Sequence, residues 1–351
     1  MMFSIPDANA DLLPGALDAP GGFAWWYADL LDDSGNGVVL IPAWGLPFLP
    51  GYAGAARRGA APPPLRRPSL AVSVYQGGRP AYYLVHELRP QDTSRDGHAL
   101  RFGDSTLEFD RGSLRAVLDL PGPGGRLKGE VLVDGVPRRP VVDCPTRHPE
   151  HEWAPLCGPA RGSWNLGVGG RRWCGDGSAY LDRNAGLAHL EALGIGRWTW
   201  ARAQLPDRLR VGYAVWTPAG LESSLIVDVM GDGTPVVRPA VAQPARSRRN
   251  AWGLRWWPSL TLVSGAARME ISVRHRPDNG PFYLRHLCEV RTEVGDAPGM
   301  GEVCESARVD VAWQRPLVQM AVQRQGGPNS MFLPLFSGPA EGRLPRWVRG
   351  W

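Results

Sequence analysis

The sequence predicts an all-β protein of antiparallel strands, arranged as two barrel-like or sandwich domains side by side with few short helices. Glycine and proline occur 44 and 34 times, and they interrupt the chain too often for long helices. Short apolar runs recur roughly every ten residues with glycine-containing turns between them, which is typical of sandwiches and barrels. The length of 351 residues is enough for two domains of about 150 residues each.

The N-terminal half carries the clearest strand patterns. Residues 22–30 and 38–41 are apolar runs joined by a Ser-Gly-Asn-Gly turn, which predicts a β-hairpin. Residues 50–68 are rich in Pro, Gly, Ala and Arg, and we expect a long exposed loop there. A series of strands is expected over residues 69–142, with its strongest runs at 70–75, 81–85, 106–109, 113–120 and 127–133.

The C-terminal half returns to the strand pattern after a less regular stretch at residues 143–173. Residues 209–217 and 221–230 predict a second hairpin. Residues 309–323 predict a short helix, with Pro316 in its first turns, where proline is tolerated. Further strands are expected at 260–263, 267–276 and 282–292, a polar arginine-rich segment at 239–251, and no element from residue 326 onward.

A domain boundary is expected near residue 170. It divides the chain into an N-terminal β-domain at residues 1–170 and a C-terminal β-domain at residues 171–351. Each half holds many antiparallel strands, but no repeat of fixed period relates the two. A single large β-domain is the alternative.

Composition and charge indicate a cytoplasmic protein. The net charge of +5 comes from scattered arginine pairs, and no nucleic-acid motif accompanies them, so we expect no nucleic-acid partner. Five cysteines form no CxxC pair, which indicates reduced thiols. No secretory signal is expected, and no apolar stretch approaches the ~20 residues of a membrane span. Peripheral contact with the inner membrane stays open, because basic surfaces attract anionic lipid. The oligomeric state is not indicated.

Several common site motifs are incomplete. The glycines at residues 167–170 do not complete a phosphate-binding pattern between a strand and a helix. Residues 162–165 lack the second glycine of a nucleophile elbow. His148 and His151 lie three apart without an obvious third ligand nearby, so no metal site is predicted.

The most informative stretch covers residues 174–203. Tyr180 and Asp182 lie two apart in its first half. Trp198 and Trp200 repeat this spacing in the second half. Residues two apart in a strand point to the same side, so each pair can face one space. A carboxyl group facing an aromatic-lined space is a candidate for acid chemistry on an apolar substrate. A turn in which Asp182 bonds to the backbone is the structural alternative.

The order of the motifs resembles the carotenoid 1,2-hydratases, also called hydroxyneurosporene synthases. That family carries H-x-W, then Y-x-D-x-N-x-G, then W-x-W-x-R-A. The matching residues are His151, Trp153, Tyr180, Asp182, Asn184, Gly186, Trp198, Trp200, Arg202 and Ala203. Residues 25–29 resemble the family's first strand, and residues 281–285, 301–302 and 313–315 its C-terminal part. The family often has an acidic residue and a proline after the second motif, whereas the sequence Leu-Ala-His-Leu-Glu follows it here at residues 187–191.

The resemblance implies a pair of lipocalin-like β-domains and a hydro-lyase that uses no cofactor. Such an enzyme adds water across the terminal C1–C2 double bond of an acyclic carotenoid, such as lycopene or neurosporene, and forms a tertiary alcohol. The expected partner is therefore a hydrophobic polyene. Related lipocalin-like proteins include pericyclases, so a pericyclase or cyclase acting on a polyene is one alternative. A non-catalytic carrier of lipid or pigment is the other.

Hydration of a trisubstituted alkene begins with proton transfer to carbon, which requires a carboxylic acid that stays protonated at neutral pH. Asp182 is the candidate acid, because burial in an apolar pocket raises the pKa of a carboxyl group. Trp153 and Tyr180 offer π-faces to the resulting cation, and His151 is the candidate acceptor for the proton of the water. The expected substrate-binding residues are Asn184, which holds the water or orients the acid, and Trp198, Trp200, Trp25 and Tyr27.

Overall fold

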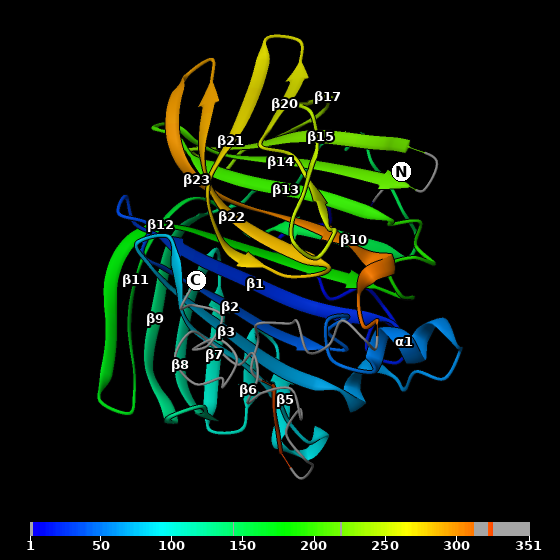
Figure 1. The fold of residues 1–351 in the computed structure, drawn as a ribbon, viewed down its shortest axis with the longest axis vertical. Coiled ribbons are helices and arrows are strands. Elements are labelled where there is room, and N and C mark those ends of the chain that lie inside the picture. Colours follow the sequence, from blue (N-terminus) through cyan, green and yellow to red (C-terminus); the bar gives the residue numbers. More distant parts are fainter. Residues whose placement is uncertain (1–2, 143, 218–219, 312–321, 326–351) are drawn as a thin grey trace.

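The computed structural model describes residues 3–142, 144–217, 220–311 and 322–325, and it is almost entirely β-structure (Figure 1). Two large sheets make up the fold, one of 13 strands and one of 9. In Figure 1 the second sheet, coloured green to orange, lies above the first. A separate two-stranded pair joins β18 (Arg248–Arg249) to β19 (Arg255–Trp256). The all-β class expected from the sequence is confirmed.

The first sheet comprises the strands that precede residue 187 and one strand from near the C-terminus. They are β1 (Phe23–Leu31), β2 (Gly37–Trp44), β3 (Pro68–Gln76), β4 (Arg79–Glu87), β5 (Thr93–Asp96), β6 (Ala99–Phe102), β7 (Ser105–Asp110), β8 (Ser113–Gly122), β9 (Gly125–Pro137), β10 (His151–Pro155), β11 (Cys157–Val168), β12 (Arg171–Gly186) and β24 (Val322–Arg324). Their order is β24-β4-β3-β2-β1-β12-β11-β9-β8-β7-β6-β5, with β10 paired to β12. The sheet curls, because β3 contacts β6 and β4 contacts β8, and it encloses an apolar core.

The second sheet follows in the chain. Its strands are β13 (Arg197–Gln204), β14 (Arg208–Thr217), β15 (Gly220–Met230), β16 (Pro235–Pro239), β17 (Val241–Pro244), β20 (Ser259–Ser264), β21 (Ala267–Asn279), β22 (Tyr283–Thr292) and β23 (Gly295–Glu305). Their order is β16-β15-β14-β13-β23-β22-β21-β20-β17. Only Ala240 separates β16 from β17 in the chain, yet these strands end the order on opposite sides. The sheet therefore curls back on itself, and β15 contacts β17 and β20.

A further apolar core lies between the two sheets. It joins Tyr27, Trp153 and Tyr180 of the first sheet to Trp198 and Trp200 of the second. These positions face one another because side chains alternate along each strand, so every second residue points toward the opposite sheet. Many of the buried aromatic side chains among the described residues thus lie where the two sheets meet.

Both predicted hairpins are confirmed. β1 and β2 pair across the first expected turn. β14 and β15 pair in the second hairpin, whose residues 218–219 lie outside the described part of the chain. The strands expected within residues 69–142 and 260–292 are present as β3 to β9 and β20 to β22. Period-2 patterning and glycine turns were sufficient for these elements.

The long exposed loop predicted at residues 50–68 is wrong in part. The segment contains α1 (Tyr52–Arg57) and a 3-10 turn, η1 (Pro64–Arg66). Tyr52 is buried, and its hydroxyl donates to the carbonyl oxygen of Gly22 at 2.7 Å. The Pro and Gly content of this segment indicates a loop, and local sequence does not reveal contacts with residues distant in the chain. Short 3-10 turns also occur at η2 (Pro90–Asp92) and η3 (Ser306–Arg308).

Two further expectations need correction, one strand was missed, and one predicted helix lies mainly outside the described residues. The less regular stretch at residues 143–173 contains β10, all of β11 and the first residues of β12, and the polar segment at 239–251 contributes β17 and β18. Strand β23 was not predicted, because its glycines and proline suggest a loop. The helix expected at residues 309–323 falls mainly on residues 312–321, outside the described residues, and its end forms part of β24.

The change from one sheet to the other falls between β12 and β13. The boundary predicted near residue 170 lies in the turn between β11 and β12, which both belong to the first sheet. The predicted boundary therefore falls inside the hairpin that β11 and β12 form. The division into domains at residues 1–170 and 171–351 stays a prediction.

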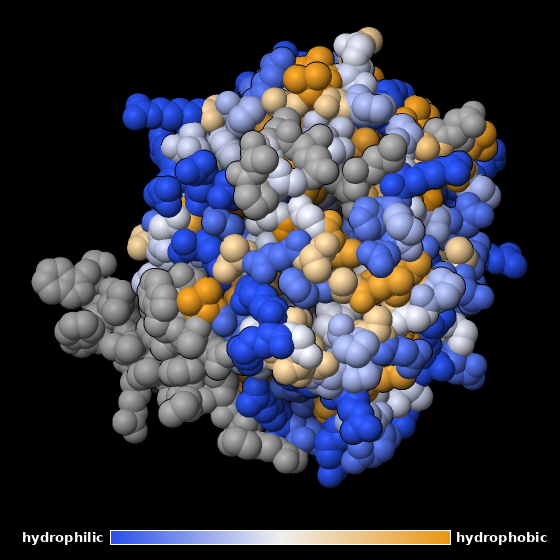
Figure 2. Space-filling view, turned by 90° about the vertical axis from the view of Figure 1, so that its right-hand side faces the viewer, coloured by the Kyte–Doolittle hydropathy of each residue, from blue (hydrophilic) through white to orange (hydrophobic). Residues whose placement is uncertain are grey.

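The surface is mixed in character. Figure 2 shows one face, on which hydrophilic residues predominate and hydrophobic ones form separate small groups. Among the described residues, the exposed large hydrophobic side chains lie on separate segments: Leu65, Val117, Leu132, Val142, Val241 and Val294. Within the described ranges, no helix is long and apolar enough to cross a bilayer.

Candidate active site

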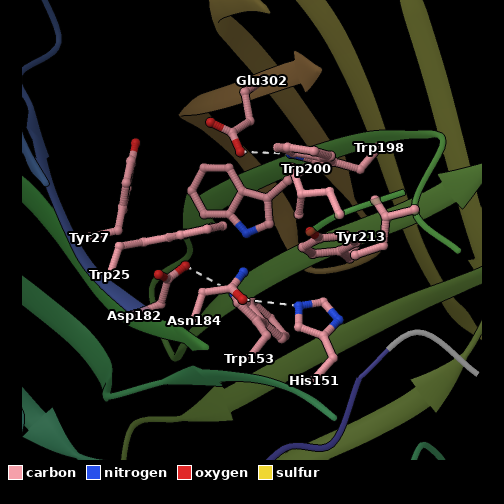
Figure 3. Close-up of a pocket in the computed structure, with 12 residues that line it drawn as sticks. Trp25, Tyr27, His151, Trp153, Asp182, Asn184, Trp198, Trp200, Tyr213 and Glu302 are labelled. Carbon is pink, nitrogen blue, oxygen red and sulfur yellow. Dashed lines mark hydrogen bonds between the residues drawn. The ribbon is translucent and has the colours of Figure 1, made fainter. Parts of the chain in front are cut away.

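A pocket lies between the two sheets, within the core that they share (Figure 3). It contains about 440 Å³ of space free of protein atoms, its open mouth included. One wall comes mainly from β1, β10 and β12, and the facing wall from β13, β14 and β23. The lining residues are Trp25, Tyr27, His151, Trp153, Asp182, Asn184, Leu190, Ile195, Trp198, Trp200, Tyr213 and Glu302.

The first wall is centred on β12, which has β1 on one side and β10 on the other. Asp182 is paired with Tyr27 of β1. Asn184 is paired with Trp153 of β10. Asp182 and Asn184 face the second sheet together, because they lie two apart. Arg183 takes the opposite face and lines a separate cavity. The strand therefore presents only an acid and an amide to the pocket from these three positions.

The facing wall is a row of side chains on neighbouring strands. Trp200 of β13 is paired with Tyr213 of β14 on one side and with Glu302 of β23 on the other. Trp198 lies two residues before Trp200 and shares its face. Its Nε1 donates to Glu302 Oε1 at 2.9 Å. Figure 3 shows these side chains opposite those of the first wall.

The Asp182 carboxyl group has hydrogen-bond partners on one oxygen only. Its exposed fraction is 6%. Trp153 Nε1 and Tyr180 Oη each donate to Oδ2 at 2.9 Å. Oδ1 is buried and has no hydrogen-bond partner among the described residues. Since Oδ2 already accepts two hydrogens, the proton of a neutral Asp182 belongs on Oδ1.

Burial raises the pKa of Asp182 to about 8. The hydrogen bonds from Trp153 and Tyr180 lower this pKa, while the negative charges of Glu302 and Asp29 raise it. Burial also raises the pKa of Tyr180 well above its ordinary value, so its phenol stays a hydrogen-bond donor. Asp182 is therefore a neutral acid at pH 7, and its pKa is close enough to that pH for proton release.

His151 supports the first wall from β10. It is buried, and its Nε2 lies 3.0 Å from Asn184 Oδ1. An amide oxygen only accepts hydrogen bonds, so Nε2 is the donor in this pair. Phe3 and Phe23 pack edge-on against the imidazole, with ring centroids 5.8 and 5.9 Å away. These contacts fix the imidazole, which in turn orients the Asn184 amide next to Asp182.

Glu302 receives donors on both carboxylate oxygens. Besides the Trp198 contact on Oε1, Tyr283 Oη donates to Oε2 at 2.5 Å. Arg285 Nη2 lies 3.9 Å from Oε2. Charge-assisted contacts of this kind stabilise a carboxylate. Nearby, Trp200 Nε1 is buried without a hydrogen-bond partner among the described residues, so one indole N–H is left to bind a group in the pocket.

The structure brings the nine site residues expected from the sequence into one place. Eight of them line the pocket, and Tyr180 lies behind the first wall with its hydroxyl on Asp182. Tyr213 and Glu302 were not predicted as site residues, although Tyr213 lay in a predicted strand and Glu302 in a segment of the resemblance. Only strand pairing shows that they flank Trp200. Leu190 and Ile195 were also missed, and they carry no local signal.

The histidine pair noted in the sequence does not form a larger cluster. The rings of His148 and His151 lie 6.2 Å apart in an edge-on arrangement. His148 Nδ1 accepts the backbone N–H of Glu150 at 3.1 Å. Across the described ranges, no group of three or more His, Cys, Asp or Glu side chains is placed to hold a metal ion.

Fold and site together define a class of protein: a two-sheet β-protein that holds a neutral carboxylic acid in an aromatic pocket between its sheets. Residues 41–330 match the family model described as carotenoid hydratase CrtC. The chain belongs to this family of carotenoid hydratases.

Two curated relatives agree with this assignment. The acyclic carotenoid 1,2-hydratase of Thiocapsa roseopersicina is 31% identical over 277 residues, which cover 78% of this chain and 65% of that protein. The acyclic carotenoid 1,2-hydratase of Rubrivivax gelatinosus is 30% identical over 194 residues, 54% of this chain and 46% of that protein. The chain thus spans less than two thirds of the length of these two relatives.

A structure described as AttH from Nitrosomonas europaea has the same fold, with a TM-score of 0.61. The two chains are 13% identical, and the match covers 84% of this chain and 97% of that one. An identity this low speaks for the fold alone. The lipocalin-like, all-β fold class predicted from the sequence is confirmed.

Proposed function

We propose that the protein is an acyclic carotenoid 1,2-hydratase, a hydro-lyase acting on a polyene of the lycopene or neurosporene type. Family membership and the names of the relatives support the substrate class. The observation that carries the proposal is the neutral Asp182 carboxyl group, whose Oδ1 has no hydrogen-bond partner among the described residues and lies in an aromatic pocket. A cytoplasmic location with peripheral contact at the inner membrane stays a prediction, which sedimentation with anionic lipid vesicles would test.

The first step is proton transfer from Asp182 Oδ1 to C2 of the terminal double bond. The π electrons form the new C2–H bond, and C1 is left as a tertiary carbocation. Trp153 and Tyr180 stabilise the Asp182 carboxylate that results, because both donate to Oδ2. General acid catalysis of this kind contributes about 10²–10⁴-fold to the rate.

The carbocation is stabilised by the aromatic rings that surround the acid. The Trp200 ring lies 5.1 Å from Tyr180 and 5.6 Å from Tyr27, centroid to centroid. A cation over an aromatic face gains about 0.5–2 kcal/mol per contact. The Glu302 carboxylate adds a negative charge on the facing wall. Groups from both sheets therefore stabilise the positive charge that develops at C1.

Water then attacks C1 and completes the addition. Trp200 Nε1 is free among the described residues to donate to the water oxygen, and the Asn184 amide lies on the opposite wall. The oxygen forms the C1–O bond, and His151 accepts the proton that the water loses on Nδ1, because Nε2 already carries the hydrogen donated to Asn184. Asp182 regains a proton from solvent, and His151 returns its own. The sum is one water added across C1–C2.

The test is chromatography with mass detection on cells that accumulate lycopene or neurosporene. With the protein present, we expect a product heavier by one water. Asp182→Asn should lower its formation at least about 100-fold, because the acid is lost. Asp176→Asn is the matched control, since Asp176 lies on the same strand with a side chain that is 79% exposed.

Three results would contradict the proposal in different ways. Hydration by a folded Asp182→Asn variant would remove Asp182 from the mechanism. A polyene rearranged without a gain in mass, with Asp182→Asn still active, would indicate a pericyclase or cyclase. A polyene that is bound and released unchanged would indicate a carrier.

A further inference from the structure

A second cavity lies between the same two sheets, on the side of β1 away from β12. It is formed by β2, β3 and β4 of the first sheet and by the turn between β21 and β22 of the second. It contains about 640 Å³ of space free of protein atoms, its open mouth included. Much of its lining is apolar, with side chains that include Val39, Ile41, Ala71 and Phe282.

Aromatic side chains separate the second cavity from the Asp182 pocket. Phe48 stacks on Trp198 of the Asp182 pocket, with ring centroids 6.4 Å apart. It also stacks on Phe282 of the second cavity, at 5.7 Å. Tyr283 lies against Phe48 at 5.6 Å and donates its hydroxyl hydrogen to Glu302. Glu302 and Arg285 both hydrogen-bond the Tyr283 hydroxyl, whereas Phe48 has no polar atom to anchor it and is only half-buried.

The charged groups of the second cavity are paired with one another. Tyr75 Oη donates to Asp278 Oδ2 at 2.8 Å, and Tyr83 donates to Asp278 Oδ1. Arg285 Nη1 donates to Tyr75 Oη at 2.8 Å and lies 3.6 Å from Asp278 Oδ2. A ligand therefore meets a mainly apolar surface whose two charges already balance, which favours a hydrocarbon over an anion or a cation.

We propose that the second cavity binds the polyene chain next to the reacting end group. This inference rests on the proposed function. With the end group in the Asp182 pocket, the conjugated chain must continue outward, and Phe48 and Tyr283 stand between the two spaces. Each Å² of apolar surface removed from water contributes about 25 cal/mol. Binding of the chain far from the reacting bond holds C1–C2 against Asp182.

The test uses substitutions that fill part of the second cavity and leave its polar and charged side chains in place. Ala71 is buried on β3 and lines the second cavity, so Ala71→Leu occupies part of it. Ala10→Leu is the matched control, because Ala10 lines the separate cavity that Arg183 also lines. Binding of lycopene in detergent micelles is followed by quenching of tryptophan fluorescence. Both substitutions are made in an Asp182→Asn background, so that turnover does not interfere.

Ala71→Leu should raise the dissociation constant for lycopene at least about tenfold, equivalent to 1.4 kcal/mol. Ala10→Leu should change it less than about twofold. Ile41→Phe fills the same cavity from β2 and serves as a second variant if Ala71→Leu does not fold, with thermal unfolding as the check. Unchanged lycopene binding in folded cavity-filling variants overturns the proposal.

The two proposals fail in distinguishable ways. If the cavity-filling variants weaken lycopene binding but the wild-type protein does not hydrate any polyene, the chain-binding site stands and the hydratase assignment fails. If the wild-type protein hydrates lycopene and the filled variants bind it as tightly as before, the hydratase assignment stands and the chain-binding site fails.

Discussion

Two buried aspartates on neighbouring strands of the first sheet differ in the charge of their partners. Asp182 of β12 and Asp29 of β1 have exposed fractions of 6% and 0%. Asp29 is paired across the strands with Tyr180, whose hydroxyl donates to Asp182. Arg202 Nε donates to Asp29 Oδ1 at 2.9 Å, whereas both donors to Asp182 are neutral.

The comparison shows that depth alone does not determine what a buried carboxyl group does. A cation beside it favours the ionised form, and burial without a cation favours the neutral acid. Arg202 belongs to β13 of the second sheet, so the Arg202–Asp29 ion pair also joins the two sheets near the pocket. One aspartate therefore holds the walls in position, while the other keeps a proton between them.

Breaking the Arg202–Asp29 ion pair should have the largest effect on stability. Arg202→Met preserves the unbranched hydrocarbon stem of arginine but leaves the Asp29 carboxylate buried without its cation. Removing one partner of a buried ion pair costs about 3–5 kcal/mol of the free energy of unfolding. Urea denaturation of the purified variant at neutral pH measures this loss.

The double variant Arg202→Met with Asp29→Leu is the control for that experiment. Replacing both partners by apolar groups is often neutral or stabilising, so most of the lost stability should return. Equal stability of the single and double variants would show that the unpaired carboxylate is not the source of the loss.

Asp182 has no cationic partner, so its effect on stability should depend on pH through its own protonation. Its pKa is about 8 in the folded protein, against about 4 in an unfolded chain. Its contribution to stability is therefore fully present below about pH 4 and is lost as the pH rises through about 8. Between these values the free energy of unfolding falls by up to about 1.4 kcal/mol per pH unit.

The Asp182→Asn variant lacks this titration. Its stability relative to the wild-type protein should therefore increase steadily from about pH 5 to about pH 8. Thermal or urea unfolding of both proteins across that range measures the difference. A difference that stays constant with pH would show that Asp182 is not protonated in the folded state.

The part of the site that could be predicted from sequence is the part encoded by local spacing. Period-2 alternation places Asp182 and Trp200 on the inner faces of their strands, whatever those strands pair with. An acid facing aromatic residues can therefore be predicted from the sequence of one stretch of chain, residues 174–203. The fold class followed for the same reason, since hairpins are formed by residues close in sequence.

The rest depends on pairing between distant strands. Glu302 reaches the pocket because β23 pairs with β13 across about a hundred residues, and no local pattern encodes that register. The partnership of Asp29 with Arg202 crosses from one sheet to the other. Likewise, His151 lies in a stretch whose prolines suggest irregular structure, and it becomes a strand residue only because β12 offers an edge for β10.

The smallest effect is expected from removing the negative charge of Glu302 on the facing wall. Glu302→Gln keeps an acceptor for Trp198 but removes a negative charge that raises the pKa of Asp182. Hydration requires protonated Asp182, so wild-type turnover should fall as the pH rises through about 8. In the variant this fall should begin at lower pH, and kcat at pH 7 should drop by about tenfold or less, equivalent to 1.4 kcal/mol. The pH profiles of kcat/KM and of kcat measure the displacement and the drop.

Tyr180→Phe is the control with the opposite sign. It removes a hydrogen bond that lowers the pKa of Asp182, so the fall in activity should move to higher pH. Opposite displacements by two near-isosteric variants, one on each wall, would assign the titration to Asp182, because no other carboxyl group accepts a hydrogen bond from Tyr180 among the described residues. If both variants displaced the profile in the same direction, or neither did, the titrating group would have to be sought elsewhere in the pocket.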